Sequence, residues 1–500
     1  MHGLVARTVN AVALSAVLLA GACAGTGGQS SARPGPSGPG RWGTAIEVPG
    51  SATLATGGGP WTAAVSISSV SCASPGDCTA AGNTGLIGSR QQPFVVSQVR
   101  GAWRKARAIP GLAALNAGHN ASAGPVSCAS PGDCSAGGWY WDYRHHARAF
   151  VVSEVRGTWK EAVEVPGTAA LGTLSAQLSS VSCTTPGNCS AGGTYYLSDR
   201  RGQAFVVSET RGKWLRAITV PGLARLNPDG TAGLTEVSCS SPGNCSAAGT
   251  YTDTSHNTRV FVVSEVRGTW GEAIQAPGTA ALGSPGVGGV SCGSAGNCAV
   301  VGYYGGQGFE YPFVENQVNG TWRSAIPVPG MAAFGQKGNG HLNAVSCAAP
   351  GDCAAAGSEG INNGFDAYGG GQPFVVTETN GTWATARLVP GVTALNTGAD
   401  GGVTTLSCAS AGNCSAGGYF GIGRPDQKVY DYSAFVVSEV NGVWGRAMRI
   451  PGLRALNRGK QAGVAAVSCA AAGRCSAGGS YEDGTYHGQA FVVTQGGSAG

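Results

Sequence analysis

The cysteines are the most regular chemical feature of this chain. Sixteen of the 17 fall into eight pairs with five residues between the partners. Thiols at close spacing either form disulfides or ligate zinc, but zinc-binding cysteines usually lie two to four residues apart, with a second ligand pair nearby. Eight copies of one spacing therefore favour disulfides formed in an oxidising compartment. The expected pairs are Cys72 with Cys78, Cys128 with Cys134, Cys183 with Cys189, Cys239 with Cys245, Cys292 with Cys298, Cys347 with Cys353, Cys408 with Cys414 and Cys469 with Cys475.

Aromatic residues with polar tips are the second group that could carry chemistry. Such side chains can stack on sugar rings or anchor a protein partner. The stretch from Trp139 to His146 occurs once and is the strongest binding candidate. A tyrosine that recurs directly after the double glycine, such as Tyr195, Tyr251 or Tyr303, has the alternative role of packing within its own repeat. The candidate ligand-binding residues are Trp139, Tyr140, Trp141, Asp142, Tyr143, Arg144, His145, Tyr196, Asp199, Arg200, Tyr304, Tyr368, Tyr419, Tyr430, Tyr432 and Tyr481.

A search for catalytic, metal and cofactor motifs finds little. The chain contains no nucleophile elbow, Walker loop or zinc-protease helix. His145 and His146 are adjacent, and adjacent side chains on a strand point apart, so they make a poor metal site. Asn227–Gly230 and Asn396–Gly401 are Asx-rich turns first and weak calcium sites second. We therefore predict no metal and no cofactor, with no catalytic residue identified.

These residues sit on a unit that occurs eight times. Its first cysteines recur every 53 to 61 residues, a period typical of solenoids and propellers. Each unit holds four short strand candidates separated by turn residues such as Pro186-Gly187 and Arg211-Gly212. In an antiparallel meander, both of these short turns lie at one end of the sheet, and the long variable loops lie at the other. The four strands are clearest at residues 178–183, 189–195, 203–210 and 213–220.

The ends of the chain favour a closed ring. Residues 42–50 match the fourth strand of the repeat but are not preceded by its first three strands. The last copy of the repeat stops after its third strand at Phe491–Val493. Pairing these fragments removes the exposed sheet edges, as in the velcro closure of propellers. We predict an all-β protein, an eight-bladed β-propeller of four-stranded antiparallel blades. The predicted segments are 1–22 signal peptide, 23–41 lipid-anchor cysteine and disordered tether, 42–495 propeller and 496–500 flexible tail.

Two further residue types recur once in most blades. A residue present in nearly every blade is expected to serve the blade rather than a single site. We therefore expect the tryptophans to pack between neighbouring blades, while the acids could hydrogen-bond a turn. They are Trp42, Trp103, Trp159, Trp214, Trp270, Trp322, Trp383 and Trp444, and Glu154, Glu209, Glu265, Glu378 and Glu439.

The repeat resembles known propeller families. Gly137-Gly138, followed by Trp159 and Val165-Pro166, resembles the kelch repeat, and the resemblance covers nearly all of the chain from Trp42 to Val493. Ser153 to Trp159 looks like a shortened Asp-box turn that lacks its Asp. The Val-Ser-Cys-x5-Cys-Ser-Ala-Gly-Gly pattern is similar to repeats of secreted actinobacterial propellers. These resemblances imply the fold and say almost nothing about activity.

The N-terminus has the features of an export signal. Arg7 precedes an apolar run from Val9 to Leu19, which has signal-peptide rather than membrane-spanning length. Leu18 to Cys23 resembles a bacterial lipobox, although Ala20 stands where that pattern favours Leu. Ala20-Gly21-Ala22 also fits an ordinary cleavage site. We expect a protein of the cell envelope, lipid-anchored through Cys23 at the outer face of the cytoplasmic membrane, with plain secretion as the alternative.

The amino-acid composition limits the classes of partner that we expect for this protein. Only 11% of residues are charged and the net charge is +5, with no run of Lys and Arg. Nucleic acid is therefore not expected as a partner. We expect a monomer that does no catalysis and binds an extracellular glycan or protein through its long-loop face. The alternatives are an enzyme acting on extracellular polysaccharide and a structural scaffold of the envelope.

Overall fold

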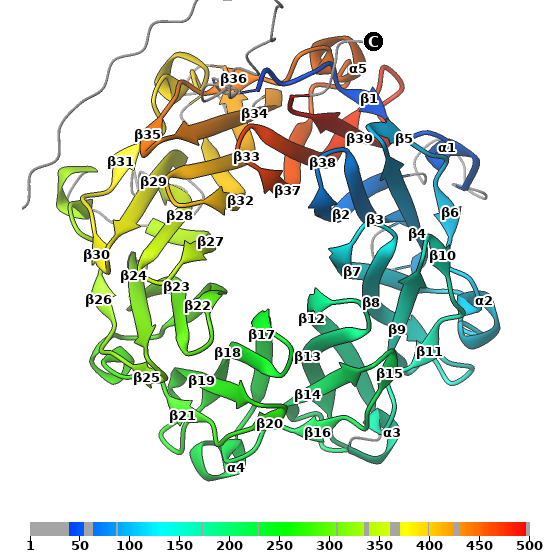
Figure 1. Ribbon diagram of the computed structural model, residues 1–500, viewed down its shortest axis with the longest axis vertical. Coiled ribbons are helices and arrows are strands. Elements are labelled where there is room, and N and C mark those ends of the chain that lie inside the picture. The colour runs from blue at the N-terminus through cyan, green and yellow to red at the C-terminus, as the bar shows by residue number, and fades with distance from the viewer. Residues whose placement is uncertain are drawn as a thin grey trace, which may run out of the picture. The chain divides into compact units, whose positions relative to one another are not determined.

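Eight antiparallel sheets follow one another around a ring and form an eight-bladed β-propeller (Figure 1). The computed structural model describes residues 40–54, 64–86, 89–171, 174–228, 230–306, 309–334, 340–360, 371–398, 400–423 and 431–496. In blades 1 to 7 the innermost strand is the first in sequence, and the fourth strand is split into two short segments that both pair with the third.

Blades 1 to 4 contain β2 (Val65–Ser74), β3 (Asp77–Leu86), β4 (Ser89–Val99), β5 (Ala102–Trp103) and β6 (Arg107–Ala108); β7 (Ala121–Ser130), β8 (Asp133–Trp141), β9 (Ala147–Val155), β10 (Thr158–Trp159) and β11 (Val163–Glu164); β12 (Ser175–Thr185), β13 (Asn188–Tyr196), β14 (Gly202–Thr210), β15 (Lys213–Trp214) and β16 (Ile218–Thr219); and β17 (Ala232–Ser241), β18 (Asn244–Thr252), β19 (Thr258–Val266), β20 (Thr269–Trp270) and β21 (Ile274–Gln275).

Blades 5 to 8 contain β22 (Gly286–Ser294), β23 (Asn297–Gly306), β24 (Phe309–Val318), β25 (Thr321–Trp322) and β26 (Ile326–Pro327); β27 (Gly340–Ala349), β28 (Asp352–Gly360), β29 (Gly371–Thr379), β30 (Thr382–Trp383) and β31 (Arg387–Leu388); β32 (Gly401–Ser410), β33 (Asn413–Ile422), β34 (Asp431–Val440), β35 (Val443–Trp444) and β36 (Met448–Arg449); and β37 (Ala462–Ala471), β38 (Arg474–Glu482), β39 (Gly488–Thr494) and β1 (Ile46–Glu47).

Short helical turns follow the fourth strands. They are α1 (Ser51–Leu54), α2 (Leu112–Leu115), α3 (Thr168–Leu171), α4 (Leu223–Leu226), η1 (Thr279–Ala281), η2 (Met331–Phe334), η3 (Val392–Ala394) and α5 (Leu453–Leu456). Within the described parts of the chain, no helix is long and apolar enough to span a membrane.

The predicted closure is confirmed. β1 pairs antiparallel with β39, with Ile46 opposite Val492. Trp42 forms a further antiparallel bridge with Gln495. The N-terminal strand β1 thus completes the last blade and covers the edge of its third strand, β39.

An inner ring of serines joins neighbouring blades. The Ser directly before the first Cys of each blade accepts a hydrogen bond from the main-chain N–H of the first Cys in the next blade. Ser182 accepts from Cys239 at 3.0 Å, for example. The same bond occurs at every seam, at 2.9 to 3.0 Å, with acceptors Ser71, Ser127, Ser182, Ser238, Ser291, Ser346, Ser407 and Ser468.

An outer ring of main-chain bonds explains why the fourth strand is split. The N–H of Ala217 donates to the carbonyl of Pro166 in the preceding blade at 2.7 Å, so it is not available to its own sheet. The sequence predicted one strand over 213–220, and this diverted bond divides it. The equivalent donors and acceptors are Ala45 and Pro451, Ala106 and Pro49, Ala162 and Pro110, Ala273 and Pro221, Ala325 and Pro277, Ala386 and Pro329, and Ala447 and Pro390.

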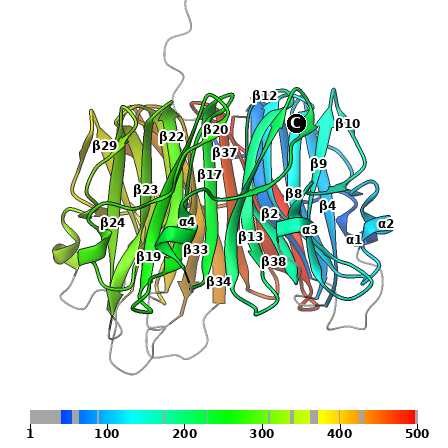
Figure 2. The ribbon, with the colours of Figure 1, turned by 90° about the horizontal axis from the view of Figure 1, so that it is seen from below.

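The two ends of the blades differ as predicted (Figure 2). The two short turns of blade 3 meet where Gly212 N donates to the carbonyl of Gly187 at 2.9 Å. We call this side of the ring the short-turn face. On the opposite, long-loop face, the segment that enters blade 2 meets the loop between its second and third strands, where Gly118 N donates to Trp141 O at 2.9 Å.

The repeated tryptophans and acids lie between blades. Trp270 of blade 4 packs against Ala204 and Val206 of blade 3, and its indole N–H donates to Ser208 of that blade at 3.4 Å. The tryptophans therefore have the packing role predicted for them. Glu209, Glu265 and Glu439 accept hydrogen bonds from hydroxyls of the preceding blade rather than from a turn, as when Ser208 donates to Glu265 at 2.8 Å. Glu378 accepts instead from the side-chain amide of Asn316 in the preceding blade.

All eight predicted disulfides are present. Each joins directly opposed residues of the first hairpin of a blade, such as Cys183 and Cys189. Their Cα atoms lie 3.9 to 4.0 Å apart. The bridges fix the register of hairpins that are rich in small residues and would otherwise slip easily.

Some predictions fall outside the described residues. These are the signal peptide, the anchor at Cys23, the tether up to residue 39, Tyr368, Tyr430 and the tail at 497–500.

Candidate ligand-binding site

A cavity of about 380 Å³ opens on the long-loop face across blades 7, 8 and 1. It contains three of the aromatic residues chosen from the sequence, and we call it the tyrosine cavity. Its volume lies in the range of small-molecule sites. Its lining residues are Ala64, Val65, Ser66, Asn83, Gly85, Gln91, Thr404, Tyr419, Tyr432, Gln461, Ala462, Gly463, Val464, Ser480, Tyr481, Glu482 and Gly488.

Two tyrosines of blade 7 form an aromatic corner of the cavity. Tyr419 on β33 and Tyr432 on β34 have ring centroids 5.8 Å apart and an interplanar angle of 70°. The hydroxyl of Tyr432 donates to Asp400, which fixes the orientation of that ring. Both side chains are partly exposed. Burial, together with the charge of Asp400, raises the pKa of Tyr419, so its hydroxyl stays protonated at neutral pH.

A glycine leaves the space into which the tyrosines open. Gly463 lies on β37, the innermost strand of blade 8, and a Cβ atom there would be 3.8 Å from Tyr419 Cβ. The same repeat position holds Gln177 in blade 3 and His341 in blade 6, six residues before the first Cys of the blade. A long side chain is therefore compatible with the backbone there, and its absence in blade 8 contributes to the cavity.

The cavity is lined by both polar and apolar groups and contains no cationic side chain. None of its lining residues is Lys or Arg. The nearby Lys460 pairs with Asp431, with Nζ and Oδ2 3.0 Å apart. Burial and the neighbouring Asp483 raise the pKa of Glu482. The site therefore suits a neutral or basic ligand and disfavours an anionic one.

Tyr481 and Tyr140 contribute less to the surface than their sequence positions suggested. Both are 3% exposed. The hydroxyl of Tyr481 donates to Glu47 at 3.4 Å, and that of Tyr140 donates to Glu164 at 3.1 Å. Tyr195 is held in the same way by Thr219, at 2.8 Å. These tyrosines have the in-blade packing role that was the alternative for the recurrent tyrosine.

Blade 2 presents a second aromatic group on the long-loop side of the ring. The ring centroids of Trp139 and Trp141 are 6.3 Å apart, and His145 meets Trp141 edge-on at 5.5 Å. Tyr143 is 71% exposed, and the guanidinium of Arg144 lies 5.1 Å from the centre of its ring. We call Trp139, Trp141, Tyr143, Arg144 and His145 the blade 2 aromatic group.

Asp142 shapes the loop that carries this group. It accepts hydrogen bonds from the main-chain N–H of Arg144 at 2.8 Å and of His146 at 3.0 Å, and from Arg148 Nε at 3.0 Å. Burial alone would raise its pKa, but these bonds lower it below the usual value. Asp253 forms the same turn in blade 4, so this acid has a structural role that recurs.

The remaining sequence candidates are spread around the ring. In blade 3, Asp199 pairs with Arg201 at 2.7 Å, Arg200 adopts a positive φ of 68°, and Tyr196 ends β13. In blade 5, the ring centroid of Tyr304 lies 5.7 Å from that of Tyr311. Among the candidates that the structure describes, only Tyr419, Tyr432 and Tyr481 thus lie around one cavity.

Two features were missed from the sequence. Gly463 was not singled out, because Gly also stands at this position in blades 4, 5 and 7, as Gly233, Gly286 and Gly402, and only blades 3 and 6 carry a large polar side chain there. His341 was also missed. Its Nε2 atom lies 2.6 Å from Glu310 Oε2, and its ring centroid lies 4.6 Å from that of Tyr303 in the neighbouring blade. Among the described residues, no group of three or more His, Cys, Asp and Glu could hold a metal ion.

Comparison with known proteins identifies no family for this chain. No protein-family model matches the chain, and no curated protein matches it. Among solved structures, YCF48 from Cyanidioschyzon merolae is 14% identical, with a TM-score of 0.41 over 75% of this chain and 96% of that one. An ulvan lyase of polysaccharide lyase family PL25 is 10% identical, with a TM-score of 0.44 over 75% and 90%. The Hadza microbial sialidase Hz136 is 9% identical, with a TM-score of 0.36 over 81% and 68%.

Proposed function

We propose that this protein is a non-catalytic propeller that binds a neutral glycan in the tyrosine cavity. The observation that carries the proposal is the corner of Tyr419 and Tyr432 in a cavity with no Lys or Arg in its lining. Aromatic faces stack on the apolar faces of sugar rings, and the surrounding Gln, Asn and Ser groups match sugar hydroxyls.

The charge of the cavity selects the class of glycan. Glu482 is the acid in its lining, and the carboxylate of Asp400 lies behind Tyr432. Sulfated or uronate-rich chains would meet these acids without a compensating cation, which costs binding energy. A neutral oligosaccharide avoids this cost. An aromatic-lined cavity of this kind is not expected of a purely structural scaffold.

A glycan array tests the proposal. The array should contain neutral, uronate-bearing and sulfated oligosaccharides, and it should be probed with the wild-type protein, Tyr419→Ala and Gly463→Gln. Gly463→Gln fills the cavity with a side chain that blade 3 carries at the same position as Gln177. We expect binding to neutral glycans that both variants lose.

A matched control separates the two aromatic regions. Tyr143→Ala removes the most exposed ring of the blade 2 aromatic group and should leave glycan binding unchanged. Binding that survives Tyr419→Ala and Gly463→Gln but is lost on changing Trp139, Trp141 and Tyr143 to Ala would place the site on blade 2 and contradict the proposal.

A second candidate, an enzyme acting on extracellular polysaccharide, is favoured by one pair on the long-loop face. His341 Nε2 lies 2.6 Å from Glu310, and an imidazole held by a carboxylate can act as a general base. A panel of polysaccharides assayed for new chain ends would show turnover that His341→Gln abolishes. The absence of turnover by the wild-type protein would remove this candidate.

The location of the protein follows from its disulfides and its N-terminus. Eight disulfides fit an extracytoplasmic protein. Anchoring through a lipid on Cys23 is our further proposal, supported by the lipobox-like residues before it. Metabolic labelling with a fatty acid, lost in Cys23→Ala, would support the anchor. Labelling absent from the wild-type protein would indicate plain secretion.

Kinship with kelch-like and secreted actinobacterial propellers is likewise proposed. It is supported by the double glycine, because a Cβ on Gly138 would lie 1.9 Å from the carbonyl oxygen of Ser122. It is also supported by the position of Trp159 between blades, where it is 6% exposed. This kinship carries no information about the ligand.

A further inference from the structure

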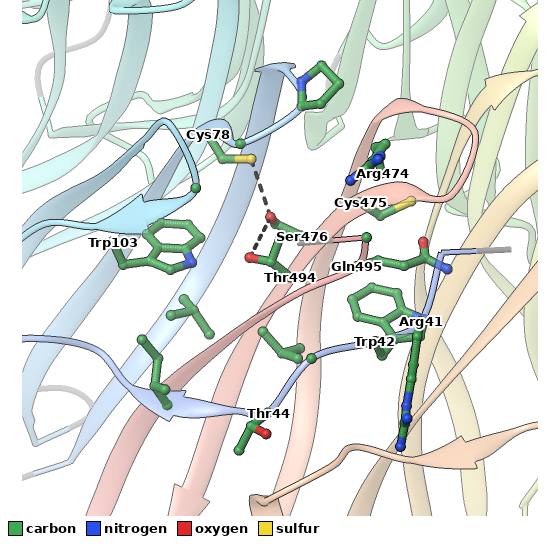
Figure 3. Close-up of a pocket in the computed structure, with 18 of the residues that line it drawn as sticks. Arg41, Trp42, Thr44, Cys78, Trp103, Arg474, Cys475, Ser476, Thr494 and Gln495 are labelled. Carbon is green, nitrogen blue, oxygen red and sulfur yellow. Dashed lines mark hydrogen bonds between the residues drawn. The ribbon is translucent and has the colours of Figure 1, made fainter. Parts of the chain in front are cut away.

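The seam at which the ring closes contains a cavity of about 710 Å³ between blades 8 and 1, on the short-turn face. We propose that this closure cavity binds an extended, phosphate-bearing anion. The site lies on the face opposite the tyrosine cavity, and the proposal does not depend on glycan binding. Figure 3 shows Trp103 on one side of the cavity, Ser476 and Thr494 in the middle, and Trp42, Arg474 and Gln495 on the other side.

The charge of the cavity is the first argument. Arg41, Arg100 and Arg474 line it, and no Asp or Glu does. All three side chains are exposed. They come from three separate segments: the strand-like stretch before β1, the short turn after β4 and the start of β38. Guanidinium groups match phosphate oxygens through paired hydrogen bonds, and the size of the cavity suits a group with several charges.

Arg474 is the second argument, because it breaks the repeat at the seam. The residue before the second Cys is Asp or Asn in the other seven blades: Asp77, Asp133, Asn188, Asn244, Asn297, Asp352 and Asn413. Those side chains cap the turn between the third and fourth strands, as Asn188 does by accepting from Arg211 N at 3.3 Å. Blade 8 takes its fourth strand from the N-terminus and has no such turn. In blade 8 there is therefore no turn for this residue to cap, and the position is occupied by the cationic side chain of Arg474.

The third argument is that acids are replaced by amides at this seam. Gln98 and Gln495, like Gln317 in blade 5, occupy the position that holds Glu154, Glu209, Glu265, Glu378 and Glu439 in the other blades. Gln98 Nε2 donates to Thr494 Oγ1 at 2.9 Å. The equivalent hydroxyl at the seam of blades 3 and 4 instead accepts from the Trp270 indole at 3.4 Å. The buried indole nitrogens of Trp103 and Trp42 have no hydrogen-bond partner, as is also the case for Trp159 of blade 2.

The corresponding cavity between blades 3 and 4 shows the contrast. It measures about 470 Å³ and is lined by Glu209 and Glu265 together with Arg216 and Arg267. Acidic and cationic side chains are thus present in equal number in this cavity, and the indole N–H of Trp270 has a hydrogen-bond partner. The closure cavity thus differs from the cavity between blades 3 and 4 in the charge of its lining and in its size, and both differences favour a large anion.

Occupancy of the closure cavity has a structural consequence. An anion held by Arg41, Arg100 and Arg474 bridges the N-terminal segment, blade 1 and blade 8. These are the parts whose contacts close the ring. A ligand that binds only the folded state raises its stability by mass action. Binding should therefore be visible as a rise in melting temperature as well as in a titration.

The test uses the full chain and sodium tripolyphosphate as the probe, at constant ionic strength set with NaCl. Arg100→Asn and Arg474→Asn are well suited variants, because other blades carry Asn at both positions, as Asn319 and Asn188. Arg267→Asn is the matched control, since Arg267 occupies the repeat position of Arg100 in the balanced cavity. We expect tripolyphosphate to raise the melting temperature of the wild type and of Arg267→Asn. Each closure variant should weaken tripolyphosphate binding about tenfold, the loss expected for one charged hydrogen-bonding group.

A second arm separates a soluble phosphate from a lipid headgroup. Vesicles containing phosphatidylglycerol are compared with phosphatidylcholine vesicles in a sedimentation assay, using the same variants. Arg-dependent binding to phosphatidylglycerol alone would assign the phosphate to a membrane lipid and support the proposal. Absence of binding in both arms, equal stabilisation by sulfate, or equal loss in Arg267→Asn would overturn it.

Discussion

The main-chain N–H of Cys72 donates to Ser468 Oγ at 2.9 Å, across 396 positions of the chain. This bond is the closing member of the inner serine ring, and it joins blade 1 to blade 8. It is equivalent to the bond between Cys292 and Ser238 at 3.0 Å, which joins consecutive blades. The closure seam therefore has the same inner connection as any other seam.

The first prediction concerns this ring. Ser468→Ala leaves the N–H of Cys72 without its acceptor and should lower the free energy of unfolding by about 1 kcal/mol. Ser238→Ala should cost a similar amount, because the bond it removes is equivalent. Urea denaturation followed by tryptophan fluorescence measures both. An unchanged midpoint for Ser468→Ala would show that the bond contributes nothing to closure.

The second prediction concerns the double glycine. A Cβ on Gly193 would lie 2.0 Å from the carbonyl oxygen of Gln177, whereas a Cβ on Gly192 would first meet Leu234 Cδ1 at 2.8 Å. The main-chain carbonyl of Gln177 cannot move away from a new Cβ, whereas the side chain of Leu234 can change its conformation. Gly193→Ala should therefore destabilise the protein by about 3 kcal/mol or prevent folding, and Gly192→Ala should cost about 1 kcal/mol or less.

Other blades provide a natural check on this second prediction. Ala248 and Ala356 stand at the position of Gly192, while all eight blades have Gly at the position of Gly193. Thermal unfolding of the two variants makes the comparison. Equal melting temperatures would contradict the role given to the second glycine.

The third prediction concerns pH. Glu315 replaces the Val found at this position in the other blades, such as Val207 and Val263. It is 1% exposed, neither carboxylate oxygen has a hydrogen-bond partner, and burial raises its pKa to about 9. The unfolded chain releases this proton near the usual pKa of about 4.3. Between these two values the folded state holds the extra proton, so stability falls as pH rises.

Glu315→Val should abolish that slope. At pH 7 it should raise the free energy of unfolding by about 2 kcal/mol, because it removes an unpaired buried polar group. The gain should be smaller at pH 4.5, where the unfolded carboxyl is also largely protonated. Glu161→Gln, at an exposed glutamate, controls for the change in charge. A pH profile for Glu315→Val that parallels the wild type would refute the assignment.

The fourth prediction concerns the disulfides. Joint replacement of Cys239 and Cys245 by Ala removes one bridge that closes a short loop. By the chain-entropy argument this should lower the free energy of unfolding by about 2 kcal/mol. Full reduction should lower the melting temperature much further, since eight bridges are lost. A reduced protein as stable as the oxidised one would mean that the bridges do not fix hairpin register.

The fold could be predicted because its determinants recur along the chain. We could recognise the Cys pairs, the Pro-Gly turns and the terminal strand fragments from short stretches of sequence. Because the repeat occurs eight times, a departure in one copy did not obscure the pattern. Burial of Tyr140 was also accessible from the sequence, since alternation along β8 places it on the opposite face from Trp139 and Trp141. The split of the fourth strand was not, because it depends on a bond from Ala217 to the neighbouring blade.

The tyrosine cavity was hidden for a related reason. Tyr419 is visible as an aromatic residue that departs from the repeat, but its partners come from other blades. Gly463 contributes to the cavity because it has no side chain, and Asn83 lies more than 300 positions away from Tyr419 in the sequence. Only the closure of the ring brings blades 7, 8 and 1 together. The sequence predicted aromatic ligand-binding residues on the long-loop face and placed the main candidate on blade 2, whereas our proposal places the site in the tyrosine cavity.

Hydrogen–deuterium exchange of the full chain, with and without the neutral oligosaccharide that binds most strongly on the array, tests the central claim most directly. The account predicts slower exchange in peptides that contain Tyr419, Gly463 and Glu482, with no change in blade 4. Protection confined to residues 139–146, or protection absent from blades 7 and 8, would contradict it.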